Sequence, residues 1–384
     1  MMRMRYIGLF VLCPLLVLPA EAKSQPRAAT AGYQKLRLIR VEAPSLKDPH
    51  ATQFLAANSK GQLFLLRGDT LEVFRLGSDG GFDRRLGKLA CELSGTSVYA
   101  AAMDPTGSTW AVSSPNELAL CDFAKERRPE GLEWVISSLT YSHSGPLVAV
   151  TSLGPGPGAA EARYKMAEPR VFGLKDDRWE PVAWGRASEV KEMPANPLAL
   201  MAEGKAESDA LICTGRKDAI WRASWNAYRL QKLSSSEKPE REIVVGKGDV
   251  EWQKLDQKEQ AREAGDRRAQ GLFLVPGSGP GGPVVRGVLR ALLCAPEGVL
   301  YLVVSTDEGL ALDRFDPSQN LLERVLLDEA KVSTGPMTAA LSGDELWLGG
   351  RLAADGLWRI SAEALAAAHW KPVKGVSIDG KPVS

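Results

Sequence analysis

Short apolar segments alternate with tight turns along most of this 384-residue chain. Five stretches share one pattern: an apolar strand, a turn of Asn, Asp, Pro, Ser or Gly, and then a strand in which apolar and polar residues alternate. These stretches lie at 56–66, 102–112, 141–150, 293–304 and 340–350. A third apolar strand recurs at 71–76, 118–123, 219–224, 310–315 and 356–361. Because Gly and Pro supply tight-turn dihedral angles and period-two alternation is typical of half-buried strands, the pattern predicts an all-β protein.

The turns recur at a nearly constant spacing. Gly61, Gly107 and Gly145 are 46 and 38 residues apart, and Gly298 and Gly343 are 45 apart. A period of about 40–50 residues is typical of the four-stranded blade of a β-propeller. Counting such units predicts seven blades, with six as the alternative because the fifth unit is irregular. The seven predicted blades lie at 50–90, 96–133, 136–184, 194–233, 242–288, 289–327 and 335–375.

One phrase occurs twice in the chain, as GRKDAIWRAS at 215–224 and as GRLAADGLWRIS at 350–361. Arg216 and Arg351 are 135 residues apart, which is three units of 45. We therefore interpret the two phrases as the same hairpin in two blades, with a longer turn in the second.

The predicted propeller occupies residues 34–375 as a single domain. The segment 34–42 is expected to supply the outer strand of the last blade, since a closed ring removes exposed strand edges. Two insertions interrupt the rhythm: 154–169, which is too long for a hairpin loop, and 248–270, which is typical of a short charged helix. Residues 376–384 are expected to form a C-terminal tail.

The first residues have the pattern of an export signal. Arg3 and Arg5 precede an apolar run that ends in small residues, so residues 1–22 are expected to be removed and 23–33 to form a flexible N-terminus. A retained anchor is the alternative, although the run is shorter than the roughly 20 apolar residues of a typical span. No later apolar stretch is long enough to cross a membrane. We expect a soluble monomer that is exported to the periplasm or the extracellular space.

Charge argues against some classes of partner. Cleavage of the signal would change the formal net charge from +1 to zero, because it removes Arg3, Arg5 and Glu21. A neutral protein has no electrostatic footprint for nucleic acid or for anionic lipid.

Cleavage would also leave four cysteines: Cys91, Cys121, Cys213 and Cys294. An even number in an exported protein is compatible with two disulfides, for which three pairings exist. Cys91–Cys121 is the favoured bridge, because these residues lie in neighbouring repeats. Free buried thiols are the other interpretation, because each cysteine lies in an apolar strand. No Cys-x-x-Cys or Cys/His cluster indicates zinc.

The phrases DPTGSTWAV at 104–112 and APEGVLYLVV at 295–304 resemble the blade signature of exported bacterial propellers of the NHL, lactonase-like and quinoprotein-like kinds. The resemblance covers most of the mature chain and is carried by general blade motifs, which identify no member family. It implies a ring with a polar mouth.

By this resemblance, a lactonase-like enzyme would hold a divalent cation such as Ca²⁺ with oxygen ligands around the central mouth. The candidate ligands lie on predicted second-to-third strand turns: Asn116, Asp218, Asp307 and Asp355. They do not match that family's motif, and Asp and Asn are also ordinary turn residues.

No catalytic residue is predicted. Histidine occurs only at 50, 143 and 369, and His143 is expected to be an exposed turn residue. No Gly-x-Ser-x-Gly elbow, His-Glu-x-x-His or phosphate-loop motif is present. The recurring tryptophans are expected to pack between blades: Trp110, Trp221, Trp347 and Trp358.

The second-to-third strand turns of different blades lie on one face of a propeller. Seven residues are therefore expected to form one mixed-charge binding rim: Arg67, Asp69, Asn116, Arg216, Asp218, Asp307 and Arg351. Arginines on such a rim could bind carboxylates, and the alternative is a set of independent turn residues with no shared role.

Together these observations favour an exported binding or scaffold propeller without enzymatic activity. It would hold a protein or a small ligand through one ring face, without a cofactor. The alternative is a metal-dependent lactonase-like hydrolase with Asp and Asn ligands for Ca²⁺ at the central mouth.

Overall fold

A computed structural model describes most of the strands and turns of the chain. The described residues are 35–41, 52–77, 82–93, 98–114, 117–132, 135–151, 170–184, 210–224, 228–236, 239–246, 252–253, 284–285, 288–306, 308–328, 337–350 and 356–383. The chain divides into two units, 1–33 and 34–384, and every described element belongs to the second. Among the described residues, no helix combines the length and the hydropathy needed to cross a bilayer.

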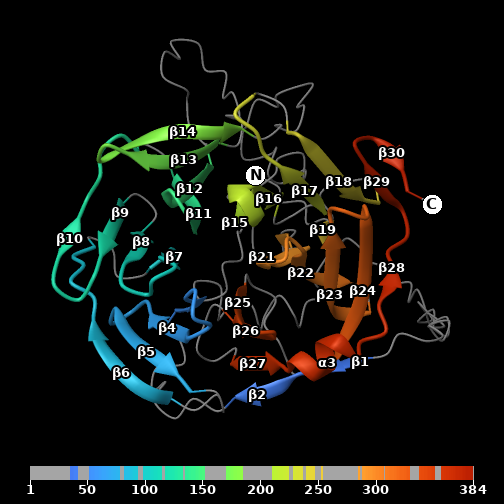
Figure 1. Ribbon diagram of the computed structural model, residues 1–384, viewed down its shortest axis with the longest axis horizontal. Helices are drawn as coiled ribbons and strands as arrows, with labels where there is room; N and C mark the ends of the chain where they lie inside the picture. The colour runs from blue at the N-terminus through green and yellow to red at the C-terminus, as the bar shows by residue number, and fades with distance from the viewer. Residues whose placement is uncertain are drawn as a thin grey trace, which may run out of the picture. The chain divides into compact units, whose positions relative to one another are not determined.

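The second unit is an all-β, six-bladed β-propeller, in which six antiparallel sheets follow one another around a ring (Figure 1). In the first three blades the strands follow the chain from the centre outward. Blade 1 contains β3 (Gln53–Ala57), β4 (Leu63–Arg67), β5 (Glu72–Leu76) and β6 (Phe82–Lys88). Blade 2 contains β7 (Ala100–Met103), β8 (Trp110–Ser114), β9 (Glu117–Cys121) and β10 (Glu126–Arg127). Blade 3 contains β11 (Val135–Ser142), β12 (Gly145–Thr151), β13 (Arg170–Lys175) and β14 (Arg178–Trp184).

The next two blades keep this order, and the sixth takes one strand from the other end of the chain. Blade 4 contains β15 (Ala210–Thr214), β16 (Ile220–Ser224), β17 (Arg229–Lys232) and β18 (Arg241–Val245). Blade 5 contains β21 (Leu289–Cys294), β22 (Leu300–Thr306), β23 (Gly309–Asp316) and β24 (Leu321–Asp328). Blade 6 contains β25 (Met337–Ser342), β26 (Glu345–Gly350), β27 (Leu357–Ile360) and β2 (Ile39–Val41).

The apolar core lies between blades. The described core residues form six clusters, one at each junction between neighbouring blades, including the junction of blade 6 with blade 1. The four tryptophans expected to pack between blades do so and are 1–3% exposed. Alternating side chains of a strand point to opposite faces of its sheet, so each blade can contribute to the junctions on both of its sides.

One buried polar network also joins two blades. The Tyr228 hydroxyl, before β17, donates to Asp313 Oδ2 on β23 at 2.6 Å. Arg324 binds both oxygens of the same carboxylate, at 2.7 and 2.8 Å. Burial raises the pKa of Tyr228 well above its usual value. The tyrosine therefore stays a neutral donor, and the fully buried Asp313 is both paired and hydrogen-bonded.

The N-terminal strand closes the ring, as predicted. β2 pairs antiparallel with β27, with Ile39 opposite Arg359 and Val41 opposite Leu357. The preceding strand β1 (Lys35–Arg37) pairs in parallel with β24 of blade 5, which the sequence pattern did not indicate. Leu36 on β1 is 5% exposed and belongs to the cluster between blades 5 and 6. The segment thus holds two neighbouring blades together.

The C-terminal residues run back along the outer edges of blades 5 and 4. After helix α3 (Ala362–Ala366), which Ser361 caps by accepting from the Ala364 N–H, β28 (Lys371–Pro372) pairs with β24. β29 (Val376–Ile378) then extends the sheet of blade 4 by pairing with β18, and β30 (Lys381–Pro382) pairs with β29. Residues 376–383, within the segment expected to be a tail, therefore belong to a six-stranded sheet.

The prediction of seven blades is wrong, and the alternative of six is the observed number. The described residues of 242–288 do not form a blade, because β18 is the fourth strand of blade 4. Other described residues of that stretch form a separate two-stranded pair, β19 (Trp252–Gln253) with β20 (Val284–Val285). The chain between β18 and β21 has nearly the length of one blade, so counting units by length added a seventh blade.

The interpretation of the repeated phrase is also wrong. β16, within the first copy, is the second strand of blade 4, whereas β27, within the second copy, is the third strand of blade 6. A Trp-Arg strand after a Gly-Arg turn suits both strand positions, because both bury one face against a neighbouring blade. Spacing alone therefore did not distinguish them.

Two disulfides are present, which rules out the interpretation of free thiols. Cys91–Cys121 joins the residues after β6 to the end of β9, and therefore blade 1 to blade 2, as predicted. Cys213–Cys294 joins the inner strands of blades 4 and 5. Disulfides persist in oxidising compartments, so the pair indicates an extracytoplasmic location.

Other sequence predictions fall on residues outside the described ranges. These are the export signal at 1–22, the N-terminus at 23–33 and the insertion at 154–169. The predicted helix at 248–270 lies outside them too, except for Trp252–Gln253, which are strand rather than helix.

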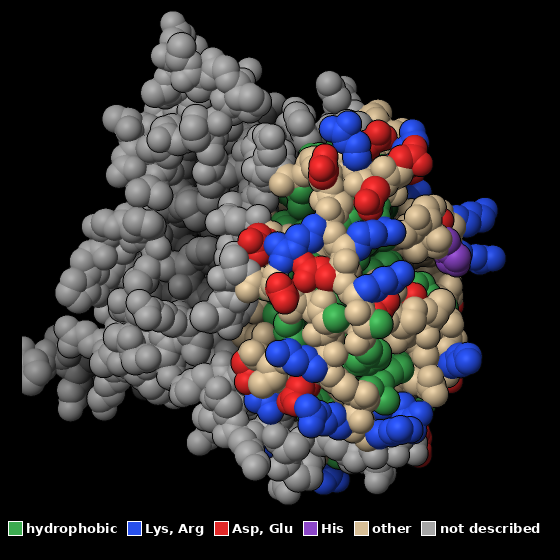
Figure 2. All heavy atoms as spheres, turned by 90° about the vertical axis from the view of Figure 1, so that its left-hand side faces the viewer, with side chains coloured by type: hydrophobic (Ala, Val, Ile, Leu, Met, Phe, Trp, Pro, Cys, Tyr) green, Lys and Arg blue, Asp and Glu red, His purple; other side chains and the backbone are tan. Residues whose placement is uncertain are grey.

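Charges of both signs are interspersed on the side of the ring shown in Figure 2, over its described part. Ion pairs in blades 1 to 3 include Arg127 Nε with Asp177 Oδ1 at 3.2 Å and Arg85 with Glu72. Exposed pairs of this kind contribute little to stability, so the ring depends on its apolar junctions.

We expect removal of residues 1–42 to lower the melting temperature and promote self-association, whereas removal of 1–33 leaves both unchanged. The longer deletion removes β1 and β2, exposes the edges of β24 and β27 and uncovers the site of Leu36. Differential scanning calorimetry and light scattering measure the two effects. An equally stable, monomeric 43–384 variant would contradict ring closure through these strands.

We expect reduction of the two disulfides to lower the free energy of unfolding by about 2–4 kcal/mol for each bridge. Urea unfolding with and without dithiothreitol measures the loss. A variant with serine at Cys91, Cys121, Cys213 and Cys294 is the control, since it should be destabilised to the same extent and should not respond to the reductant. A native protein insensitive to reduction would show that the bridges do not stabilise the ring.

Candidate functional site

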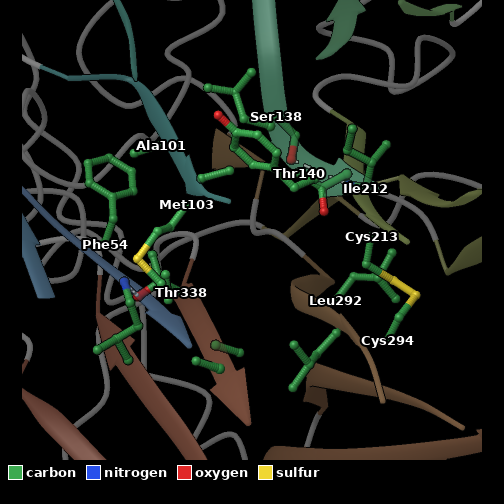
Figure 3. Close-up of a pocket in the computed structure, with 18 of the residues that line it drawn as sticks. Phe54, Ala101, Met103, Ser138, Thr140, Ile212, Cys213, Leu292, Cys294 and Thr338 are labelled. Carbon is green, nitrogen blue, oxygen red and sulfur yellow. Dashed lines mark hydrogen bonds between the residues drawn. A yellow bond between two sulfur atoms is a disulfide. The ribbon is translucent and has the colours of Figure 1, made fainter. Parts of the chain in front are cut away.

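The inner strands of all six blades surround one cavity. β3, β7, β11, β15, β21 and β25 each contribute residues to its lining, and its volume is about 450 Å³ (Figure 3). Cavities of about 300–1,000 Å³ commonly hold small molecules, so the centre of this ring has the size of a ligand site.

Small and apolar residues dominate the described lining. Strand β7 has the sequence AAAM, and its two central residues, Ala101 and Ala102, are the partly exposed ones. Leu292 and Leu293 on β21 and Ala339 on β25 are also partly exposed to the cavity. No Asp, Glu, Lys, Arg or His is among the described residues that line it. Where six strands converge, short side chains leave the central space open.

Hydroxyl groups tie the inner strands of adjacent blades. Thr338 Oγ1 on β25 accepts from the Leu55 N–H on β3 at 3.3 Å. Ser138 Oγ on β11 accepts from the Ile212 N–H on β15 at 3.4 Å, and Thr214 Oγ1 donates to the Tyr141 carbonyl. These bonds satisfy backbone groups that face the gaps between blades, where sheet pairing is not available.

The turns between first and second strands contact one another and surround one mouth of the cavity. The Ser59 N–H donates to the Pro105 carbonyl at 2.7 Å, and Ser342 Oγ donates to the Gly61 carbonyl at 2.5 Å. Asn58, Ser59, Pro105 and Pro296, from such turns, belong to the lining. We call the ring formed by the turns at 58–62, 104–109, 142–145, 215–219, 295–299 and 342–345 the first-turn rim.

His143 and Asp218 link two of these turns across blades 3 and 4. Both the backbone N–H and the ring Nδ1 of His143 lie 3.0 Å from Asp218 Oδ1. The hydrogen bond from the His143 backbone N–H is the largest influence on this carboxyl and, with the side-chain bond, lowers its pKa below the usual value. The His143 side chain is 89% exposed, which confirms its assignment as an exposed turn residue.

Arg67 and Asp69 occupy the turn between β4 and β5, which is a second-to-third strand turn as predicted. They bind each other: Arg67 Nε and Nη2 donate to the two oxygens of Asp69 at 3.3 and 2.8 Å. The Arg67 side chain is 10% exposed, so the guanidinium stabilises its own turn.

Arg216 and Asp218 lie at the other end of the blades, on the first-turn rim. They belong to the short 3₁₀ turn Arg216–Asp218 between β15 and β16, which is a first-to-second strand turn. Successive turns of an antiparallel blade lie at opposite ends of its strands. The expectation that Arg67, Asp69, Arg216 and Asp218 share one rim is therefore wrong, because it depended on equating the two copies of the repeated phrase.

The other three predicted rim residues, Asn116, Asp307 and Arg351, lie outside the described residues, as does the candidate ligand Asp355. Of the four candidate Ca²⁺ ligands, the structure thus describes only Asp218, whose carboxylate is bonded to His143. No group of three or more His, Cys, Asp or Glu residues that could hold a metal occurs within the described ranges.

The resemblance implied a ring with a polar mouth, but the described lining of the central cavity is mostly apolar and uncharged. The signal of this lining was present in the first strand of each repeat, where small residues and hydroxyls stand among larger apolar ones, as in "AAAM" and "MTAALS". The charged turn residues predicted to form a binding rim are not part of the described lining.

Comparisons with known proteins identify no family. No protein-family model and no curated protein matches the sequence. Among solved structures, hydrazine synthase of Kuenenia stuttgartiensis is similar with a TM-score of 0.45 and 12% identity, over 84% of this chain and 76% of that one. The Cps50 (Swd1) β-propeller domain of Myceliophteria thermophila has a TM-score of 0.41 and 11% identity, over 86% and 100%. A chain of the Mitotic Checkpoint Complex has a TM-score of 0.45 and 11% identity, over 92% and 99%. These distant similarities carry no argument about function.

We expect Gly68→Ala to destabilise the protein by about 1–3 kcal/mol, as overpacking commonly does. A Cβ atom at position 68 would lie 2.0 Å from Thr52 Oγ1 and 3.0 Å from Val98 Cβ, in the turn that holds Arg67 and Asp69. Gly215→Ala on the opposite rim is the control, because its new Cβ would meet no atom closer than 3.7 Å. Urea unfolding compares the two variants. Equal stability of both would show that the contact of position 68 with Thr52 and Val98 is not tight.

Proposed function

We propose that this protein is an exported binding propeller that holds a small ligand in its central cavity and performs no reaction on it. The observation that carries the proposal is the cavity itself: about 450 Å³, bounded by the inner strands of all six blades. Binding sites are commonly concave and mostly apolar, with a few polar groups, and the described lining has this composition.

The chemistry of the lining favours binding over catalysis. General acid or base catalysis requires a titratable side chain near the reacting group, usually His, Asp, Glu or Lys. None of these is among the described residues that line the cavity, where hydroxyl groups are the main polar side chains. Tyrosine can also transfer protons, and Tyr99 and Tyr141 belong to the lining. Burial raises the pKa of Tyr141, which keeps its hydroxyl protonated. The resemblance of the blade phrases to NHL, lactonase-like and quinoprotein-like propellers supports the architecture of such a protein.

Export supports the same proposal. Two disulfides suggest an oxidising compartment, and residues 1–22 have the pattern of a cleaved signal. The site depends only on ring closure, which the chain achieves with its own N-terminal strand.

We expect Ala101→Phe to abolish binding of the neutral fluorescent probe N-phenyl-1-naphthylamine at concentrations that saturate the native protein. Ala101 lies on the described cavity wall, is partly exposed and packs beside the core between blades 1 and 2, so a phenyl group there is expected to narrow the cavity (Figure 3). Ala366→Phe, on the exposed side of α3, is the matched control and should bind as the native protein does. Fluorescence titration measures binding, and thermal unfolding checks that both variants fold. Undiminished binding of the probe by a folded Ala101→Phe variant would contradict the proposed function.

A further inference from the structure

We infer that the ligand of the central cavity is a neutral, largely apolar molecule that carries hydrogen-bond acceptors such as carbonyl or ether oxygens. This inference rests on the proposed function, since it identifies the class of ligand for the same cavity. It follows from three features of the wall: the apolar blades, the free hydroxyl hydrogens and the absence of a charge in the described lining.

Two opposite parts of the wall are apolar. Blades 1 and 2 contribute the partly exposed Ala101 beside the buried Phe54 and Met103, and blades 4 and 5 contribute the partly exposed Leu292 beside the buried Ile212 (Figure 3). In a ring of six, blade 1 lies opposite blade 4 and blade 2 opposite blade 5. The body of a ligand at the centre therefore has apolar surface on both sides, and its burial is favourable at roughly 25 cal/mol per Å².

Two other opposite blades supply hydroxyl groups. Ser138 and Thr140 lie two residues apart on β11 of blade 3, and therefore on the same side of that strand. Thr338 lies on β25 of blade 6, across the ring. All three line the cavity and are partly exposed (Figure 3).

These hydroxyls are available as donors. Ser138 and Thr338 each accept one hydrogen bond from a backbone N–H of the next blade, which leaves the hydrogen of each hydroxyl without an acceptor among the described residues. Thr140 makes no side-chain hydrogen bond within the described part of the chain. A hydroxyl whose oxygen already accepts can still donate. The complement of such a wall is an acceptor.

Charge determines the remaining property of the ligand. An ion that enters the cavity loses hydration, and the described lining offers neither a cation nor a carboxylate as a partner. The free-energy cost of removing an ion from water exceeds the stabilisation that hydrogen bonds from a few hydroxyl groups provide. A neutral molecule with one or two acceptors avoids this cost and also uses the hydroxyl hydrogens.

Three pyrene derivatives of similar size separate these properties: 1-acetylpyrene, which has an acceptor, 1-ethylpyrene, which has none, and 1-pyrenecarboxylate, which is charged. Fluorescence anisotropy titrations on the full mature chain measure their dissociation constants. We expect 1-acetylpyrene to bind about 2- to 10-fold more tightly than 1-ethylpyrene, as one net hydrogen bond implies. The carboxylate is expected not to bind at concentrations that saturate the protein with the ketone.

Two variants assign the preference to the wall. Thr140→Val removes a hydroxyl that has no partner in the described structure, and Ser138→Ala with Thr338→Val in the same chain removes the other two donors. The two neutral probes should bind this triple variant equally. Thr140→Ser keeps a hydroxyl and should retain the preference for the ketone. Thermal unfolding confirms that both variants fold.

The outcomes distinguish this inference from the function on which it rests. Carboxylate binding as tight as that of the ketone, or an unchanged preference in the folded triple variant, overturns the ligand class while the cavity remains a binding site. If none of the three probes binds, or if Ala101→Phe binds all of them as the native protein does, the proposed function itself fails.

Discussion

The structure depends on apolar packing between neighbouring blades. Hydrogen bonds of the sheet run within a blade, so they cannot hold one blade to the next except where a strand from elsewhere in the chain joins a sheet. The described core accordingly lies in six clusters at the six junctions, with the junction of blade 6 and blade 1 among them. Because each blade needs a neighbour on both sides, an open ring leaves two apolar faces in water.

The polar features of the ring serve this packing. Thr338, Ser138 and Thr214 bond backbone groups of the next blade at the inner strands, and Tyr228, Asp313 and Arg324 bond across the junction of blades 4 and 5. The two disulfides each join adjacent blades as well. The cavity is a consequence: the six inner strands around the centre do not fill it, and both small and large side chains form its wall.

Much of the fold could be predicted from the sequence, because turn glycines and alternating strands are local signals. The all-β class, the four-stranded unit, the closing strand at 34–42 and the Cys91–Cys121 bridge all follow from such signals or from the spacing of repeats. The number of blades does not, since an insertion as long as a blade between β18 and β21 imitates a repeat. The site was harder still. The rank of a strand within its blade decides which face a turn occupies, and Arg216 and Arg351 looked equivalent in sequence although β16 and β27 differ in rank.

Ring closure has a consequence for the order in which this chain can fold. β2 ends at Val41, yet its partner β27 ends at Ile360, and β29 returns to blade 4 later still. The first blade therefore cannot obtain its second neighbour until almost the whole polypeptide has been synthesised. Such late, long-range pairing is slow to form. The chain therefore lacks its native ring while it emerges from the ribosome. Only a polypeptide that has not yet folded can pass through a narrow membrane channel.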